Sequence, residues 1–275
     1  MGAAGSIGSA LCRKLVLLKP KKIIILDQDE SGIFDIYEEL KEKGNIEYVI
    51  GSIRDKEKMI QIFYDYQPQI VFHAAAYKHV VLMEKWSDEA EKTNVVGLRN
   101  VIDAALLSDV EKFIFISSDK AVNAVSVMGR TKAIGERMCL DADGKTKFII
   151  VRFGNVMPSR GSVVPIFQKQ IAEGKNLTVT SPDMRRYFMG IYDAVDLMLK
   201  AAEQGKGGEI FLLDMGEVIY IKDLAKLMIK ISGKPLEIIY THIGEGEKLH
   251  EELYDKKTET IKKVEEGLLL IKKNG

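Results

Sequence analysis

Four side chains that can move protons lie close together in the middle of this 275-residue chain. Ser118, Asp119 and Lys120 follow almost directly after the apolar run 113–116, and Lys132 comes shortly afterwards. A protonated Asp can donate to a leaving group, and a Lys that has lost its proton can act as a base. The cluster therefore predicts acid–base chemistry, although an Asp-Lys pair in a solvated loop would look the same in sequence.

Met128 and Lys132 stand four residues apart in a segment with helical periodicity, so their side chains would share one helix face. The thioether of Met128 is only a weak hydrogen-bond acceptor and carries no proton that titrates. Two interpretations therefore remain open. Either Ser118, Asp119 and Lys120 carry the proton transfers, or the protein is inactive.

A glycine-rich run at the start of the chain predicts a turn that binds a dinucleotide. In Gly2-Ala3-Ala4-Gly5-Ser6-Ile7-Gly8 the glycines are spaced so that a tight turn can enter a helix with bare backbone facing a pyrophosphate. Asp27 ends the next apolar run, where its carboxylate can accept hydrogen bonds from both adenosine ribose hydroxyls. Gln28 offers no cation to a 2′-phosphate, so NAD is favoured over NADP. The alternative is a glycine-rich helix entry followed by an Asp that caps the second helix.

Short β-branched runs alternate with amphipathic segments over the first half of the chain. We expect strands at 23–26, 48–50, 70–72, 113–116 and 148–151, and helices near 6–18, 31–43, 56–66, 88–108 and 126–140. This alternation predicts an α/β protein with a Rossmann-type, doubly wound parallel sheet, because each helix is long enough for a right-handed crossover. The catalytic candidates would then lie at the carboxyl edge of the sheet, where such folds bind their ligands.

The alternation loosens after residue 154, where a Gly/Pro-punctuated stretch leads into helices near 163–173, 191–204 and 221–232. We expect residues 1–160 to form an NAD-binding Rossmann domain, to which 191–215 returns. Residues 161–275 would form mainly a smaller C-terminal substrate-binding subdomain.

The glycine turn raises a question about the sheet, because such a turn normally follows the first and most central strand. Here it begins next to Met1. We therefore expect an N-terminally truncated catalytic core or a mis-started reading frame. In the folded chain, the strands starting near Lys22 and Ile70 would flank a central position that no strand of this chain fills.

Composition excludes several classes of partner. Lys plus Arg and Asp plus Glu number 40 each, so no net charge draws the protein to nucleic acid. No run approaches the roughly 20 apolar residues that span a bilayer, so we expect no membrane segment and a cytoplasmic protein. The two cysteines and four histidines lack the spacing of metal ligands, and we expect no metal. Cys12, Cys139 and His73 are interpreted as packing residues.

Seven short runs spread over nearly the whole chain resemble the polysaccharide-biosynthesis UDP-N-acetylglucosamine 4,6-dehydratases, a group of extended short-chain dehydrogenases/reductases. They are Ala74–Val80, Thr93–Gly97, Ser118–Asn123, Ser126–Gly129, Arg152–Val156, Ser159–Val163 and Gly246–Leu249. Within that group the chain is most similar to the large, retaining, membrane-tethered members. Those proteins also carry Met where other short-chain dehydrogenases have a Tyr, and they have membrane helices and another domain upstream.

The resemblance implies an internal redox cycle on UDP-N-acetylglucosamine. NAD would take a hydride from C4, water would leave across C5–C6, and the hydride would return to C6 to give a UDP-4-keto-6-deoxy sugar. By the same resemblance Ser118 contacts the 4-hydroxyl, Asp119 protonates the departing 6-hydroxyl and Lys120 removes the C5 proton. Lys132 would hold the nicotinamide ribose.

Binding residues are implied in the same way. Cofactor contacts would come from Gly2, Gly5, Ser6, Ile7, Gly8, Asp27, Ser52, Ile53, Ala74, Ala75, Ala76, Asn94 and Lys132. Substrate contacts would come from Lys78, Met128, Asn155, Ser162, Val163, Arg186 and Glu247. The guanidinium of Arg186 suits phosphate oxygens, although a surface arginine would look the same in sequence.

Three positions depart from the family pattern. Ser52 stands where an Asp commonly reads the adenine amino group, and Pro158 replaces a Gly. Gly244-Glu245 replaces an Arg-Pro pair whose Arg helps bind the diphosphate. We expect weaker binding of the UDP-sugar, because a charge-assisted hydrogen bond to phosphate contributes roughly 1.5–3 kcal/mol.

Two other functions stay open. A nucleotide-sugar 4-epimerase could use the same scaffold, although Asp119-Lys120 argues against it. A non-catalytic nucleotide-sugar-binding fragment would explain Met128 and Gly244. The apolar faces of helices 88–108 and 126–140 could pair two copies into a homo-oligomer, although a stripe that faces the core would look much the same.

Overall fold

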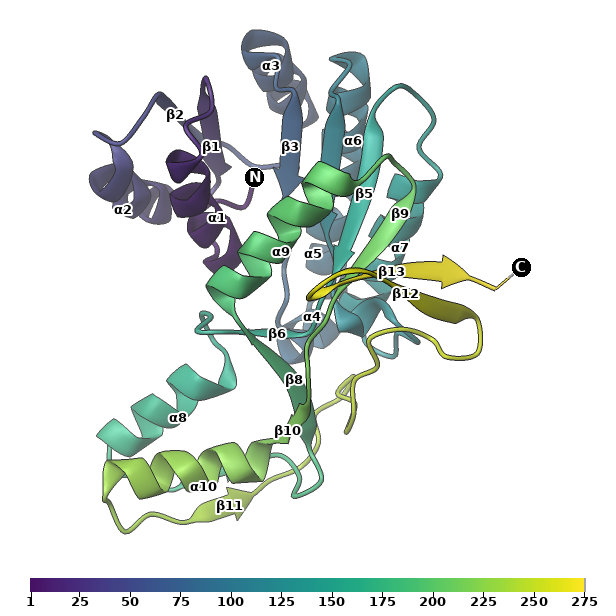
Figure 1. Ribbon diagram of the computed structural model, residues 1–275. Coiled ribbons are helices and arrows are strands. Elements are labelled where there is room, and N and C mark those ends of the chain that lie inside the picture. The colour runs from purple at the N-terminus through teal and green to yellow at the C-terminus, as the bar shows by residue number, and fades with distance from the viewer. Residues whose placement is uncertain (275) are drawn as a thin grey trace.

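The main sheet has six strands in the order β12-β13-β9-β5-β4-β3 (Figure 1). The computed structural model describes residues 1–274. Four neighbouring strands are parallel, namely β3 (Ile70–His73), β4 (Lys112–Ile116), β5 (Lys147–Arg152) and β9 (Glu209–Leu213). The hairpin of β12 (Glu259–Glu265) and β13 (Leu268–Lys273) adds to β9 in the antiparallel sense. The hairpin makes the sheet mixed at this edge, and the expected Rossmann-type α/β fold is confirmed.

A two-stranded parallel sheet, β1 (Ile23–Asp27) with β2 (Ile46–Ile50), lies beside β3. The first residues connect the two sheets. The Met1 ammonium donates to the carbonyl of Phe72 at 2.9 Å, and the Ala3 amide donates to the carbonyl of Leu26 at 3.2 Å. Within residues 1–274 no strand pairs with both β1 and β3, as the sequence led us to expect.

Successive side chains of the central strands point to opposite faces of the sheet, and different helices pack on each face (Figure 1). Phe113 and Phe115 of β4 point to a core made with α3 (Lys56–Tyr66), α6 (Leu98–Leu107) and α7 (Val127–Leu140). Ile114 and Ile116 point to the opposite core, made with α1 (Ser6–Leu17) and α9 (Ile191–Gln204). A third cluster packs α2 (Glu30–Leu40) onto β1. Both faces of the sheet are therefore covered.

The expected helix at 88–108 is interrupted. It consists of α5 (Ser87–Glu91), a π-helical segment η1 (Lys92–Gly97) and α6, and the short α4 (Val80–Lys85) precedes it. Such π-helical turns often occur at functional sites, and this one places Asn94 against the loop that follows β3. Pairing of two copies through this helix and α7 stays a prediction.

A smaller part of the molecule lies below the main sheet in Figure 1. It contains α8 (Val163–Ala172), α10 (Ile221–Ser232) and the five short strands β6 (Asn155–Met157), β7 (Leu177–Val179), β8 (Arg185–Gly190), β10 (Val218–Tyr220) and β11 (Ile238–Tyr240). Phe167 of α8, Phe188 of β8 and Ala225 of α10 form its core. The C-terminal hairpin, which lies in the range assigned mainly to the substrate-binding subdomain, belongs instead to the main sheet.

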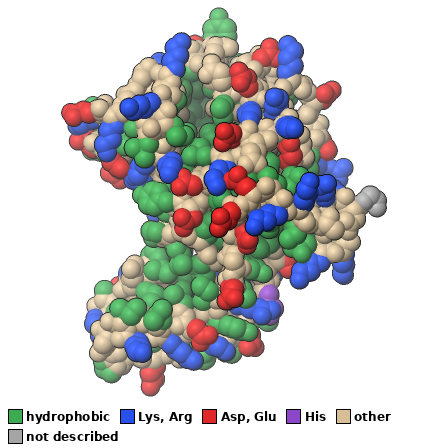
Figure 2. All heavy atoms as spheres, viewed as in Figure 1, with side chains coloured by type: hydrophobic (Ala, Val, Ile, Leu, Met, Phe, Trp, Pro, Cys, Tyr) green, Lys and Arg blue, Asp and Glu red, His purple; other side chains and the backbone are tan. Residues whose placement is uncertain are grey.

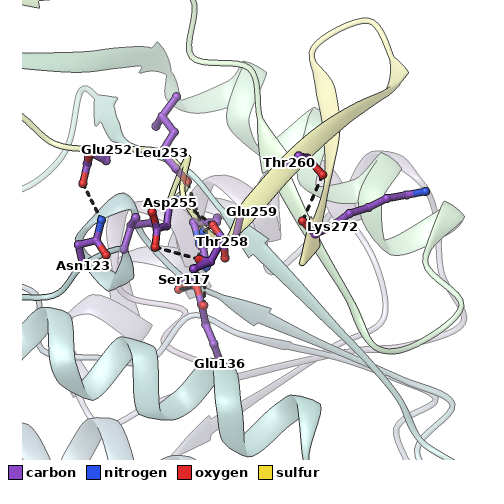
Figure 3. A network of polar contacts seen from close by, with 12 residues as sticks. Ser117, Asn123, Glu136, Glu252, Leu253, Asp255, Thr258, Glu259, Thr260 and Lys272 are labelled. Atoms are coloured by element: carbon purple, nitrogen blue, oxygen red, sulfur yellow. Dashed lines mark hydrogen bonds and ion pairs between the residues drawn. The ribbon is translucent and has the colours of Figure 1, made fainter. Parts of the chain in front are cut away.

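A buried ionic network ties that hairpin to the centre of the sheet. Arg152 of β5 is 3% exposed and donates to both carboxylate oxygens of Glu136 on α7, at 2.7 and 3.0 Å. Its third contact is Glu259 of β12 at 3.1 Å. Ser117 also donates to Glu136, and Figure 3 shows Ser117, Glu136 and Glu259 close together. The network therefore fixes the residue that precedes the Ser118-Asp119-Lys120 cluster.

Across residues 1–274 we find no helix with both the length and the apolar composition needed to cross a membrane.

Candidate active site

A cavity of about 710 Å³ lies between the large and small parts of the molecule. Figure 2 shows the molecule narrowing at this level, with hydrophobic side chains gathered along the waist. The large part contributes the glycine turn, the end of β4 and the start of α7, and the small part contributes α8 and β8. A second cavity of about 220 Å³ adjoins the first, because both are lined by Gly2, Gly5 and Arg160. The volume suits a cofactor and substrate held together.

The glycine turn has the geometry of a phosphate cradle. Gly2 has a φ of +74°, which favours glycine, and a side chain there would collide with the backbone of Ala74 and Ala75. A side chain at Gly8 would strike the carbonyl of Gly2. Helix α1 begins at Ser6 without any side-chain cap on its free amides. Exposed amides at a helix N-terminus bind phosphate, so the turn fits a dinucleotide pyrophosphate.

Asp27 lies in the second cavity, where the adenosine end of a dinucleotide would fit. Its two carboxylate oxygens accept backbone hydrogen bonds from Ala4 at 2.9 Å and Asp29 at 3.0 Å. These bonds hold the carboxylate in place and leave lone pairs for ribose hydroxyls. Ser52 and Ile53 also line this cavity, and Ser52 donates to Gln28 at 3.1 Å.

Arg160 is a functional candidate that the sequence analysis did not assign. Its guanidinium lies 3.6 Å from the carboxylate of Asp29, and its amide donates to Ser6 at 3.0 Å. Lys78 donates to the carbonyl of Arg160 at 2.9 Å. The loop around Arg160 therefore crosses over the phosphate turn and brings a cation beside Gln28, where the sequence offered none. Its one sequence signal was its place between Ser159 and Gly161 in a family-like run.

Ser118 and Lys120 both donate to one oxygen atom of Asp119. Asp119 Oδ1 accepts from Ser118 Oγ at 2.7 Å and from Lys120 Nζ at 3.0 Å. Lys120 also donates to Asn155 at 3.3 Å. Ser118, Lys120 and Asn155 line the cavity, whereas Asp119 is 0% exposed and does not. The structure thus brings the three predicted residues together, but it screens Asp119 from the cavity behind Ser118 and Lys120.

Met128 and Lys132 both line the cavity from the first turns of α7. Lys132 donates to the carbonyl of Ile116 at 2.8 Å, and its ammonium lies 4.8 Å from the centre of the Phe115 ring. Burial lowers the pKa of Lys132 to about 8. Met128 is buried against Met83 of α4. The first turns of α7 therefore present a cation and a thioether to the cavity.

The predicted substrate residues surround the same cavity. It is lined by Lys78, Ser162, Val163, Arg186 and Glu247. The guanidinium of Arg186 is held by the backbone carbonyls of residues 248 and 249, at 2.8 and 3.1 Å. Burial lowers the pKa of Lys78, and the neighbouring Lys120 adds to that effect. A phosphate-sized anion here would meet Lys78, Lys120 and Arg186, three cations from separate segments.

Among the predicted cofactor residues, Gly2, Gly5, Ser6, Ile7, Gly8, Asp27, Ser52, Ile53, Ala74, Ala75, Ala76 and Lys132 all line one or both cavities. Asn94 lines neither. Its amide side chain bonds the backbone N–H and C=O of Tyr77 at 2.8 and 2.9 Å, and it donates to Thr131 at 2.9 Å. Asn94 therefore acts on the site through Tyr77, which lines both cavities.

Similar proteins are known. A family model described as "Polysaccharide biosynthesis protein" matches residues 1–273. The probable polysaccharide biosynthesis protein EpsC of Bacillus subtilis is 48% identical over 264 residues, which cover 93% of this chain and 44% of EpsC. The chain thus spans less than half the length of this relative. A Rickettsia akari protein named UDP-glucose 4-epimerase is 38% identical over 268 residues, which cover 92% of this chain and 75% of that protein.

Among solved structures, Pen from Bacillus thuringiensis is similar with a TM-score of 0.90 and 35% sequence identity. The match covers 98% of this chain and 85% of Pen.

Proposed function

The chain belongs to the polysaccharide biosynthesis protein family, and we propose that it is the catalytic core of an NAD-dependent nucleotide-sugar 4,6-dehydratase. Its substrate would be UDP-N-acetylglucosamine and its product a UDP-4-keto-6-deoxy sugar. The observation that carries the proposal is the shared hydrogen bonding of Ser118 and Lys120 to one oxygen of buried Asp119. Elimination of water needs both an acid and a base, and in this cluster Lys120 would serve as the base and Asp119, acting through Ser118, as the acid.

NAD is the cofactor that fits the two adjoining cavities. The free amides at the start of α1 would hold its pyrophosphate, Asp27 its adenosine ribose and Lys132 its nicotinamide ribose. When bound, NAD supplies a hydride acceptor for C4 and a hydride donor for C6. Because the same hydride returns to the sugar, the cofactor would stay bound through the cycle. The loop around Arg160, which crosses over the phosphate turn, would help to keep the cofactor bound.

The protons can be assigned so that every protein group ends as it began. Ser118 passes the proton of the sugar 4-hydroxyl to Asp119, to which its own hydroxyl already donates at 2.7 Å. Protonated Asp119 later returns that proton through Ser118 to the 6-hydroxyl, which leaves as water. Lys120 takes the C5 proton and gives it back to C5 when C6 is reduced.

This route differs in one respect from the one implied by resemblance alone. There Asp119 donates directly to the leaving hydroxyl, but Asp119 has no surface on the cavity. A proton held by Asp119 must therefore pass through Ser118 or Lys120. The route also accounts for Met128, because the 4-hydroxyl proton needs no phenol at that position.

The deciding experiment is to incubate the protein with UDP-N-acetylglucosamine and follow the sugar by NMR. A 4-keto-6-deoxy product is expected. An unchanged sugar, with protein that has bound NAD, would contradict the proposal and favour a non-catalytic nucleotide-sugar-binding role.

Two substitutions separate the proton steps. Asp119→Asn should block C4 oxidation itself, because an amide cannot accept the relayed proton, so no absorbance of reduced nicotinamide should develop. Lys120→Met should allow that absorbance to develop but release no product, and in deuterated water it should lose exchange at C5. Each loss should reach about 10²–10⁴-fold in rate. Met128→Leu keeps the volume and removes no titrating group, so it should change the rate only slightly.

A 4-epimerase is the second candidate, favoured by the Rickettsia akari relative that carries that name. An epimerase oxidises and re-reduces C4 without expelling water, so it needs no acid for a leaving group. A galacto-configured product in the same NMR experiment would establish it. In that case Lys120→Met would leave substantial turnover.

A further inference from the structure

A carboxylate outside the predicted site lies between two of its cations. The Glu251 side chain is 4% exposed, and its Oε1 atom is 3.9 Å from Lys120 Nζ and 3.9 Å from Arg186 Nη2. Its other oxygen, Oε2, is buried without a hydrogen-bond partner in the described structure. A buried carboxylate oxygen that is left unpaired is energetically unfavourable, so its retention needs an explanation.

The position of Glu251 is fixed by the same segment that holds Arg186. The Arg185 amide donates to the carbonyl of Leu249 at 3.2 Å, and Arg186 donates to the carbonyls of Lys248 and Leu249. A single β-bridge also pairs Arg185 with His250. The segment that carries Glu251 is therefore held against Arg186, and Lys120 lies beside them at the end of the main sheet.

The charged groups around Glu251 are Lys120 and Asp119 from η2 (Asp119–Ala121), Arg186 from β8, and Lys248 from its own segment. Burial raises the pKa of Glu251, and Asp119 raises it further, while the three cations act in the opposite direction without cancelling the rise. The pKa of Glu251 is therefore sensitive to the loss of any one of these three cations.

We propose that Glu251 couples the binding of the substrate diphosphate at Arg186 to the proton state of Lys120. The proposal rests on the proposed function, in which Arg186 meets a nucleoside diphosphate. Without substrate, the Glu251 carboxylate is shared by the two cations. A diphosphate at Arg186 competes with Glu251 for that guanidinium, so Glu251 is left facing Lys120 in a cavity from which the substrate excludes water.

In that closed cavity the ion pair of Lys120 and Glu251 becomes a neutral pair of an amine and a carboxylic acid. Lys120 Nζ gives one proton to Glu251 Oε1, so an N–H bond breaks, an O–H bond forms and the total charge is unchanged. The two atoms must approach by about 1 Å to reach hydrogen-bond distance. Lys120 is then a free amine that can accept the C5 proton. When the diphosphate leaves, Glu251 returns its proton to Lys120. Glu251 acts through Lys120 and is therefore a positioning residue.

This coupling has a distinctive pH signature. Because the proton moves within the pair, the fraction of Lys120 present as free amine does not change with pH between the two titrations of the pair. Asp119, which also contacts Lys120, must stay ionised to accept the proton relayed by Ser118, so with Gln at position 251 the Lys120 proton must leave to solvent. The free-amine fraction should then rise about tenfold for each pH unit.

The test compares Glu251→Gln with Glu252→Gln, a matched variant at an exposed neighbour that accepts from Asn123. UDP is the probe. Its dissociation constant is measured by calorimetry, and the acetylation rate of Lys120 with UDP bound is measured by mass spectrometry between about pH 6.5 and 8.5. Glu251→Gln should bind UDP about fivefold more tightly, because the competing carboxylate is gone. Its Lys120 acetylation should rise with pH, and in the wild type and Glu252→Gln it should stay flat.

Two results would overturn the proposal. Equal or weaker UDP binding by Glu251→Gln would show that Glu251 does not compete for Arg186. Acetylation profiles of the same shape in Glu251→Gln and the wild type would show that no proton is shared. Neither measurement requires turnover, so a wild-type protein that makes no 4-keto-6-deoxy sugar would refute the proposed function separately.

Discussion

Buried Lys132 should make the protein less stable than it would be with an apolar residue, and the deficit should depend on pH. The side chain is 7% exposed and has one hydrogen bond, to the carbonyl of Ile116 at 2.8 Å. Desolvation lowers its pKa from 10.5 to about 8. The charged form is therefore less favourable in the folded protein than in the unfolded chain.

The magnitude follows from the two pKa values. The gap between 10.5 and about 8 corresponds to roughly 3 kcal/mol of unfolding free energy. Below about pH 8 both states hold the proton and the whole penalty is present. Between about 8 and 10.5 the folded protein has lost the proton while the unfolded chain keeps it, so stability rises with pH.

Lys132→Met retains the stem of the side chain but leaves the Ile116 carbonyl without its donor, which costs about 1 kcal/mol. The variant should therefore be about 2 kcal/mol more stable than wild type at pH 7. Near pH 10.5 only the lost hydrogen bond remains, so the variant should be about 1 kcal/mol less stable. The order of stabilities is expected to reverse.

Guanidinium chloride denaturation followed by circular dichroism, repeated from neutral to alkaline pH, measures both curves. Alkaline ionisation of Cys12, whose pKa burial raises to about 11, affects both proteins alike and cancels in the difference. Arg137→Met is the matched control, because Arg137 is an exposed cation on the same helix, with 84% of its side chain accessible. The reasoning would be refuted by a stability difference that does not change with pH.

Three further predictions concern the supports of the site. Arg152→Met leaves Glu136 and Glu259 buried without their cation, so it should lower the unfolding free energy by about 3–5 kcal/mol. Calorimetry should then show a melting temperature lower by roughly 6–20 °C, with Arg137→Met close to wild type. In fluorescence titrations, Asp27→Ala should weaken NAD binding and reduce the protein's preference for NAD over NADP. If the wild type bound NADP more tightly than NAD, the assignment of Asp27 to the adenosine ribose would be disproved. Arg160→Ala should speed NAD release in stopped-flow experiments, since its ion pair with Asp29 is lost, and an unchanged rate would show that the loop does not retain the cofactor.

The sequence was sufficient where structure depends on short-range periodicity. Residues 113–116 form a short continuous apolar run, which predicts a strand buried on both faces, and the Phe and Ile side chains do pack into opposite cores. The position of Ser118 then follows, because the residue after such a strand lies at the carboxyl edge of the sheet. Local pattern therefore located both the core and the candidate cluster.

Features that depend on long-range contacts were not predictable in this way. The hairpin at the C-terminus pairs with β9 through Leu268–Ile271, and no local signal specifies that partner. Arg160 reaches Asp29, and Glu251 reaches Lys120, across more than one hundred positions of sequence. The burial of Asp119 has a similar origin, because its amide bonds the carbonyl of Phe153 on the neighbouring strand's extension. Spacing along the chain contains none of this information.

Met128 explains why the chemistry depends so strongly on those long-range contacts. The thioether of Met128 can take no proton, and Lys132, while it is charged, can only donate hydrogen bonds and supply charge. In the proposed mechanism the proton of the sugar hydroxyl must then reach another acceptor, and Ser118 joins the cavity to Asp119. The carboxylate behind Ser117, that of Glu136, is already paired with Arg152. The acceptor Asp119 is shared with Lys120, which lies 3.9 Å from Glu251. Under the coupling proposed above, with no titrating group at position 128, the segment that holds Arg186 would set the proton state of Lys120 in place of α7, and that state would respond to bound diphosphate.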